Sequence, residues 1–200
     1  MADDLAKRRS IGRSDLIPTE AYRAIRKQKR AALVARKRNR RMEVGPVATF
    51  HFENFETMWL QIQEMLYIEK GGEAQIDDEL RAYAPLIPNG RELIATVMFE
   101  IDEPVRRKNF LSKLGGIEET VFLRFAGETV KGVPEADVDR TTAAGKASSV
   151  QFIHFPFTPV QAAKFRKPDT EVVLGFSHPA YGHMSVMPEA TRAALAADLD

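Results

Sequence analysis

Apolar residues recur at helical spacing directly after Asn54. The positions i, i+3, i+4, i+7, i+10 and i+11 are typical of one face of an amphipathic helix, and here they are Phe55, Met58, Trp59, Ile62, Met65 and Leu66. Asn54 is a favourable N-cap for this helix, and a Gly-Gly pair ends it. A second helix is predicted next, with Ile76, Leu80 and Tyr83 on one stripe, before prolines and an Asn-Gly pair turn the chain.

The order strand, helix, strand occurs twice in the second half of the chain. The short helices begin at Pro104 and Pro159, and alternating apolar residues predict their flanking strands at 93–101, 121–125, 150–157 and 172–176. Further strands are expected at 47–52 and 128–133, and a last helix is expected from Pro188. Two βαβ units predict an α+β fold, with an antiparallel-rich sheet in ferredoxin-like order whose helices cover one face.

The charge is divided unevenly along the chain. Residues 1–41 hold 14 of the 29 Lys and Arg residues and 4 of the 28 Asp and Glu residues, a net charge of +10. Residues 42–200 carry a net charge of −9, so the overall value of +1 hides two opposed blocks. Such an asymmetry indicates an anionic partner for the basic block, whether nucleic acid, an acidic protein surface or the acidic body of the same chain.

The basic block also has the spacing of a helix. Tyr22, Ile25, Leu33 and Val34 form a thin apolar stripe that predicts a basic helix over residues 19–41. We therefore expect a flexible N-terminus over residues 1–14 and a single domain over residues 15–200, in which the basic helix forms an N-terminal helical arm.

The cations at the end of this helix are the candidate partner-binding residues: Arg36, Lys37, Arg38, Arg40 and Arg41. Clustered Lys and Arg gain affinity for phosphates through counterion release. Tyr22 is the only aromatic residue of the block, however, so base stacking on single strands is not expected. The structural alternative is a solvated helix whose arginine stems lie along the acidic body.

Composition removes several classes of chemistry. The chain contains no cysteine, which excludes disulfides, thiolate metal sites and a cysteine nucleophile. Glu-x-x-His, His-Glu-x-x-His, Gly-x-Ser-x-Gly and dinucleotide fingerprints do not occur. No apolar run reaches the ~18 residues that a membrane span needs, and no secretory signal is recognisable. The expectation is a cytoplasmic protein without a membrane partner.

Two segments carry candidate site residues. The loop His178-Pro179-Ala180-Tyr181-Gly182-His183 places two imidazoles five residues apart, and these are weak candidates for metal ligands if a carboxylate converges on them. Gln63 and Glu64 have polar groups off the apolar stripe of their helix. If both segments face one cavity, the candidate pocket is Gln63, Glu64, His178, Tyr181 and His183. No cofactor is predicted, and packing is the alternative role for each residue.

Several short segments together resemble one family. They are Gly45-Pro46, 50–54, 61–66, 79–83 with Leu86-Ile87-Pro88, Gly116-Ile117-Glu118 and His178–Tyr181. With these segments the chain resembles, from about Asp15 to its C-terminus, the bacterial family known as domain of unknown function 3501 (DUF3501). The resemblance implies no activity, cofactor or catalytic residue. It does imply gene neighbours that encode rubrerythrin and an iron–sulfur oxidoreductase, and hence a role near redox metabolism or the peroxide response.

Three functions are compatible with these observations. The first is a non-catalytic accessory protein whose basic helix binds an acidic protein surface, on a redox partner or on a second copy of the chain. The second is a metal-binding protein or metalloenzyme that uses His178, His183 and nearby carboxylates. The third is non-specific nucleic-acid binding by the basic helix.

Overall fold

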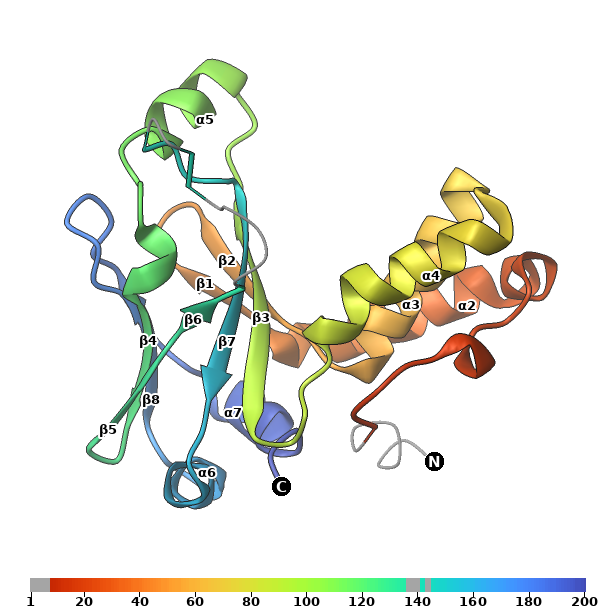
Figure 1. The fold of residues 1–200 in the computed structure, drawn as a ribbon. Helices are drawn as coiled ribbons and strands as arrows, with labels where there is room; N and C mark the ends of the chain where they lie inside the picture. Colours follow the sequence, from red (N-terminus) through yellow and green to blue (C-terminus); the bar gives the residue numbers. More distant parts are fainter. Residues whose placement is uncertain (1–7, 136–140, 143–144) are drawn as a thin grey trace.

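The structure is a computed structural model that describes residues 8–135, 141–142 and 145–200. It consists of two antiparallel β-sheets and a helical arm that projects from one of them (Figure 1). Sheet A has the order β1 (Arg41–Val44), β2 (Ala48–Phe52), β3 (Glu92–Phe99), β7 (Val150–Pro156) and β6 (Val133–Pro134). Sheet B has the order β5 (Glu128–Lys131), β4 (Val121–Phe125), β8 (Val172–Phe176) and β9 (Met184–Val186).

The main core lies between the two sheets. Because side chains alternate along a strand, each sheet turns one apolar row inward, and these rows include Phe50 and Val97 from sheet A and Leu123 and Leu174 from sheet B. All four side chains are fully buried. Aromatic rings join the sheets directly, since the centroid of Phe50 lies 5.3 Å from that of Phe176.

Two short helices close opposite ends of this sandwich (Figure 1). Helix α5 (Pro104–Leu111) connects β3 to β4, and α6 (Pro159–Arg166) connects β7 to β8. Each helix therefore leads from sheet A to sheet B. The two strands that each helix connects do not pair with each other. The corresponding strands of the two units pair, β3 with β7 and β4 with β8, and both pairs are antiparallel.

The α+β class and the antiparallel pairing are confirmed, whereas the ferredoxin-like order is wrong. In that order both units contribute to one sheet and the helices cover its face. Here α5 and α6 have eight residues each, and Val105 and Val160 in their first turns are 65% and 62% exposed. The apolar strand faces cannot be covered by such short helices, so they bury against each other as two sheets.

The helical arm consists of α2 (Thr19–Lys37), α3 (Phe55–Glu69) and α4 (Gly72–Tyr83). Helix α3 packs on both of the others. A second apolar cluster, which includes Ile62, Leu86 and Ile94, joins the arm to the outer face of sheet A through Ile94 of β3. Helix α7 (Glu189–Ala196) and four short 3-10 helices complete the described chain: η1 (Arg13–Asp15), η2 (Arg38–Arg40), η3 (Ala84–Leu86) and η4 (Ile117–Thr120).

The N-terminal part differs from expectation at both ends. Residues 8–14 belong to the segment expected to be flexible, but Ile11 is buried in the arm and Arg13 contacts Asp77 of α4; residues 1–7 lie outside the described part. The expected helix over 19–41 ends at Lys37, and Arg41 begins β1. Within the described ranges, no helix combines the length and apolarity needed to cross a membrane.

Candidate functional site

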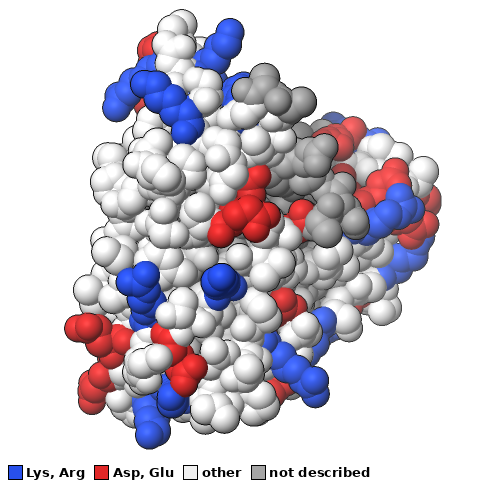
Figure 2. All heavy atoms as spheres, turned by 60° about the vertical axis from the view of Figure 1, so that its left-hand side comes forward, with Lys and Arg blue, Asp and Glu red and all other residues white. Residues whose placement is uncertain are grey.

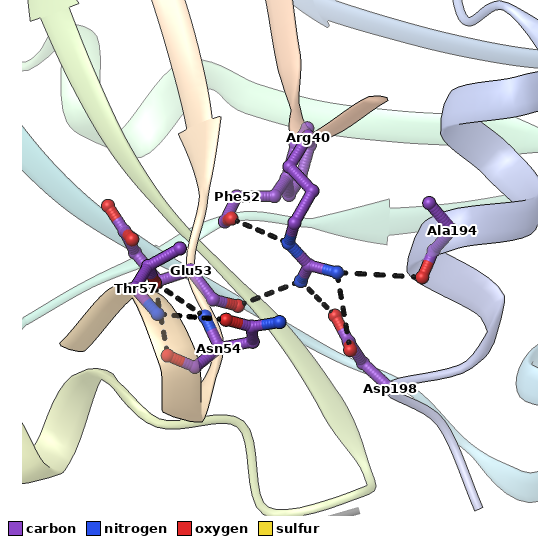
Figure 3. A network of polar contacts seen from close by, with 7 residues as sticks. All are labelled: Arg40, Phe52, Glu53, Asn54, Thr57, Ala194 and Asp198. Carbon is purple, nitrogen blue, oxygen red and sulfur yellow. Dashed lines mark hydrogen bonds and ion pairs between the residues drawn. The ribbon is translucent and has the colours of Figure 1, made fainter. Parts of the chain in front are cut away.

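Arg40 is a structural residue and not a partner-binding one. Its guanidinium donates to the carbonyl oxygens of Phe52 and Glu53, both at 3.0 Å, and forms a close ion pair with Asp198 just beyond α7 (Figure 3). It also approaches the carbonyl oxygen of Ala194 at 3.5 Å. Both charged side chains are buried. Burial raises the pKa of Asp198, and the positive charge of Arg40 opposes that rise.

The other four predicted partner-binding cations do not form one surface. Arg36 pairs with Glu56 of α3, and Arg41 lies on β1, where it contacts Glu43 at 3.1 Å. Lys37 and Arg38 are exposed at the end of α2. The run of cations looked continuous in the sequence, but a change from helix to strand at residues 38–41 distributes it over different faces.

Gln63 and Glu64 attach the beginning of α2 to α3. The side-chain oxygen of Gln63 accepts from the backbone N–H of Ile17 at 2.8 Å, and its amide nitrogen donates to the carbonyl of the same residue at 3.2 Å. Glu64 accepts two hydrogen bonds from Arg26, at 2.8 and 2.7 Å, and a close one from the Tyr22 hydroxyl. The Arg26 hydrogen bonds lower the pKa of Glu64.

The loop that carries His178, Tyr181 and His183 holds the turn between β1 and β2. The Tyr181 hydroxyl donates to the carbonyl oxygen of Val44 at 2.8 Å and accepts from the N–H groups of Val47 and Ala48. The His183 ring packs on Tyr181 with a centroid separation of 4.4 Å.

Gly45, in the middle of that turn, has φ +71°, and a Cβ there would lie 2.6 Å from His183. His178 contacts the carbonyl oxygen of Gly115 at 3.2 Å. These contacts assign a packing role to the loop.

The predicted candidate residues therefore do not converge on one pocket. Gln63 and Glu64 lie in the arm, whereas His178, Tyr181 and His183 lie beside β8 and β9 on the opposite side of the molecule (Figure 1). Within residues 8–135, 141–142 and 145–200, no three His, Cys, Asp or Glu side chains are close enough together to hold a metal ion. The geometry thus gives no support to a site built on His178 and His183.

A basic groove along α2 is a feature that the sequence interpretation missed. It is open to solvent, has a volume of about 460 Å³, and is lined by Arg23, Arg26, Lys27, Arg30, Ala31, Val34 and Tyr67. Only Arg26 among its cations is fully neutralised, by Glu64; Arg23 approaches Glu20 at 3.9 Å. Within the described part of the chain, Lys27 and Arg30 form no ion pair.

A signal for this groove was present in the sequence. Residues 23, 27, 30 and 34 are spaced i, i+4, i+7 and i+11, the period of one helical face. Three of them are cationic, and Val34, the fourth, is 71% exposed. The apolar stripe predicted for this helix includes Val34, although only Tyr22 and Leu33 of α2 are buried.

Charge is arranged differently on the sheet B side. In the face shown in Figure 2, Lys and Arg gather at the top, at the level of α5, and the surface below them is largely uncharged with scattered groups of both signs. Met184 and Val186 of β9, at one edge of sheet B, are both exposed.

The fold defines the class: a small two-sheet α+β protein with a helical arm whose positive charge lies mostly on α2. The chain belongs to the family described as "Protein of unknown function (DUF3501)", which it matches over residues 10–199. A crystal structure of a novel protein of unknown function from Burkholderia pseudomallei is similar, with a TM-score of 0.89 and 36% identity, over 96% of this chain and 100% of that chain. None of the curated proteins matches this chain.

Proposed function

We propose that this protein is a non-catalytic accessory protein that binds an acidic surface of a partner protein through the basic groove of α2. The observation that carries the proposal is the charge imbalance of that groove. Four cations line it and the only carboxylate paired with them from another helix is Glu64, while Lys27 and Arg30 form no ion pair among the described residues. Complementary charge across an interface speeds association and selects partners.

Tyr67 favours a protein partner over a nucleic acid. Binding to single strands needs aromatic rings whose faces are free for bases. The ring of Tyr67 is occupied, because the Arg26 guanidinium carbon lies 4.6 Å from its centroid and the Tyr22 ring packs edge-on at 6.1 Å. The exposed Val34 adds an apolar contact beside the cations, as expected at a protein interface.

Deletion of residues 1–41 is a poor test of this proposal. Tyr22 and Leu33 are part of the packing of α2 on α3, and Arg40 belongs to the buried network with Asp198. Loss of binding after that deletion would report loss of folding. Charge reversal at exposed positions avoids this problem.

The decisive experiment compares two double variants. Lys27→Glu with Arg30→Glu reverses the groove, and Arg106→Glu with Lys108→Glu reverses exposed cations of α5 as a matched control. The family resemblance names rubrerythrin and the iron–sulfur oxidoreductase as the first redox partners to measure, and sedimentation tests a second copy of the chain. We expect binding that weakens with salt and that only the groove variant loses. The proposal would be overturned if both double variants lost partner binding equally. It would also be overturned if the wild type bound DNA irrespective of sequence and only the groove variant lost that binding.

A further inference from the structure

A second cavity lies between α2 and α3, on a different face of α2 from the basic groove. It has a volume of about 210 Å³, and its walls are mostly apolar: Ala32 and Leu33 from α2, and Phe55, Trp59 and Leu60 from α3. Arg8, Lys29, Arg36 and Glu56 complete the lining. We call this cavity the α2–α3 pocket.

The polar groups of the pocket leave one positive charge without a counter-ion. Arg36 pairs with Glu56, and Arg8 pairs with Asp15 while its guanidinium carbon lies 4.0 Å from the Phe55 ring centroid. The Lys29 ammonium lies 5.3 Å from the Trp59 ring centroid, and no ion pair joins it to any residue in the described ranges. An ammonium held beside an apolar wall favours a ligand that brings a negative charge and an apolar body together.

The size of the cavity selects a small ligand. A cavity of ~150 Å³ lined by apolar side chains accommodates benzene, so the space here fits one ring with a small substituent. Trp59 and Phe55 offer ring surfaces for edge-on or offset packing. The indole N–H of Trp59 donates to the carbonyl oxygen of Asp15 at 2.8 Å, which fixes the orientation of that wall.

We propose that the α2–α3 pocket binds a small aromatic monocarboxylate, with the ring between Trp59 and Phe55 and the carboxylate on Lys29. A hydrogen bond between ionised groups is stronger than one between neutral groups. The site goes beyond the accessory function, because it uses residues 29, 32, 33 and 36 of α2 and not the groove residues 23, 27 and 30. Each proposal can therefore fail without the other.

Trp59 is the only tryptophan of the chain and lines this pocket, so its fluorescence follows changes at the pocket wall. The full-length protein is titrated with benzoate and, in parallel, with benzamide, which has the same ring and no charge. We expect a saturable change with benzoate and at least about tenfold weaker binding of benzamide, the ratio expected when a charged hydrogen-bond partner is lost. Benzoate also raises Tm, because a ligand that binds only the folded state stabilises it.

Three variants make the test specific. Lys29→Gln is expected to reduce benzoate affinity about tenfold or more while benzamide binding stays unchanged. Ala32→Leu fills the cavity and abolishes binding of both, with circular dichroism and Tm as checks of folding. Lys27→Gln, on the groove side of the same helix, is the matched control and leaves binding unchanged.

The proposal would be overturned by a fluorescence change that never saturates with benzoate, or by equal affinities for benzoate and benzamide. Unreduced benzoate binding by Ala32→Leu would overturn it too. Binding by Lys29→Gln that equals that of the wild type would do so as well.

Discussion

Replacing Arg40 with methionine tests the view that this cation belongs to the interior and not to an interface. Methionine keeps much of the side-chain length and removes the charge. The change leaves the buried Asp198 carboxylate without its ion pair and leaves the carbonyl oxygens of Phe52 and Glu53 without donors. Arg40 and Asp198 are 7% and 1% exposed, so water does not replace the lost contacts.

The expected cost follows from that burial. Removing one partner of a buried ion pair destabilises a protein by about 3–5 kcal/mol, a large part of a total stability of about 5–15 kcal/mol. Burial raises the pKa of Asp198 in the folded protein even when Arg40 opposes it. In the variant that pKa rises further. The loss of stability in Arg40→Met is therefore complete at pH values above the pKa that Asp198 has in the folded variant. It disappears as the pH falls from that value towards the pKa of Asp198 in the unfolded chain.

The measurement is urea unfolding of the wild type and of three variants at neutral and acid pH. Arg40→Met is expected to lose most stability at neutral pH and to recover part of the loss, relative to the wild type, at acid pH. Asp198→Asn leaves an arginine that stays charged, so its loss does not depend on pH in that way. Arg41→Met is the control, since its ion pairs are exposed and contribute about 0–1 kcal/mol. A loss below about 1 kcal/mol for Arg40→Met, similar to the control, would refute the reasoning.

Three further predictions concern the sequence-predicted pocket residues and the helix that carries two of them. Arg26 lowers the pKa of Glu64 by hydrogen bonding, so this contact stabilises the fold above the unfolded pKa of Glu64 and is lost as the pH falls. In chemical denaturation, Glu64→Gln is therefore expected to cost about 1–2 kcal/mol at neutral pH and little at acid pH. An equal loss of stability at both pH values would contradict this. Tyr181→Phe leaves the Val44 carbonyl without its hydroxyl donor and is expected to cost about 1–3 kcal/mol, with faster amide exchange confined to the β1–β2 turn; unchanged exchange there would remove the proposed role. Asn54→Ala removes the N-cap of α3, whose oxygen accepts a backbone hydrogen bond at 3.1 Å, and is expected to lower thermal stability by about 1–2 kcal/mol, whereas a neutral effect would show that the cap is dispensable.

Local patterns determined most of the secondary structure. Helices α3 and α4 and both strand–helix–strand units follow the predicted order, because hydrophobic spacing and capping act over a few neighbouring residues. Asn54 caps α3 as expected, and Thr158 caps α6 with its hydroxyl. Strands β1 and β9 were not predicted. They have four and three residues, and a run of cations and a histidine loop mask their short apolar patterns.

The candidate site depended on tertiary structure. A helical period shows which side chains share a face of α2, but not which of those faces α3 covers. The spacing therefore showed that one face of α2 carries Arg23, Lys27 and Arg30. It did not show that this face borders a groove. The pocket beside Trp59 had no counterpart in local spacing, since its walls come from α2, α3 and Arg8.

The sequence by itself determined an α+β chain with two related strand–helix–strand units, a basic N-terminal helix and no cysteine chemistry. The tertiary structure decided that the strands form two facing sheets, that Arg40 is buried against Asp198, and that Gln63 and His183 lie in different parts of the molecule. The physical reason is the range of the interactions. Spacing and caps act within one or two turns. Sheet pairing and the walls of the α2–α3 pocket instead join residues that are tens of positions apart, and the buried pair of Arg40 and Asp198 joins residues 158 positions apart.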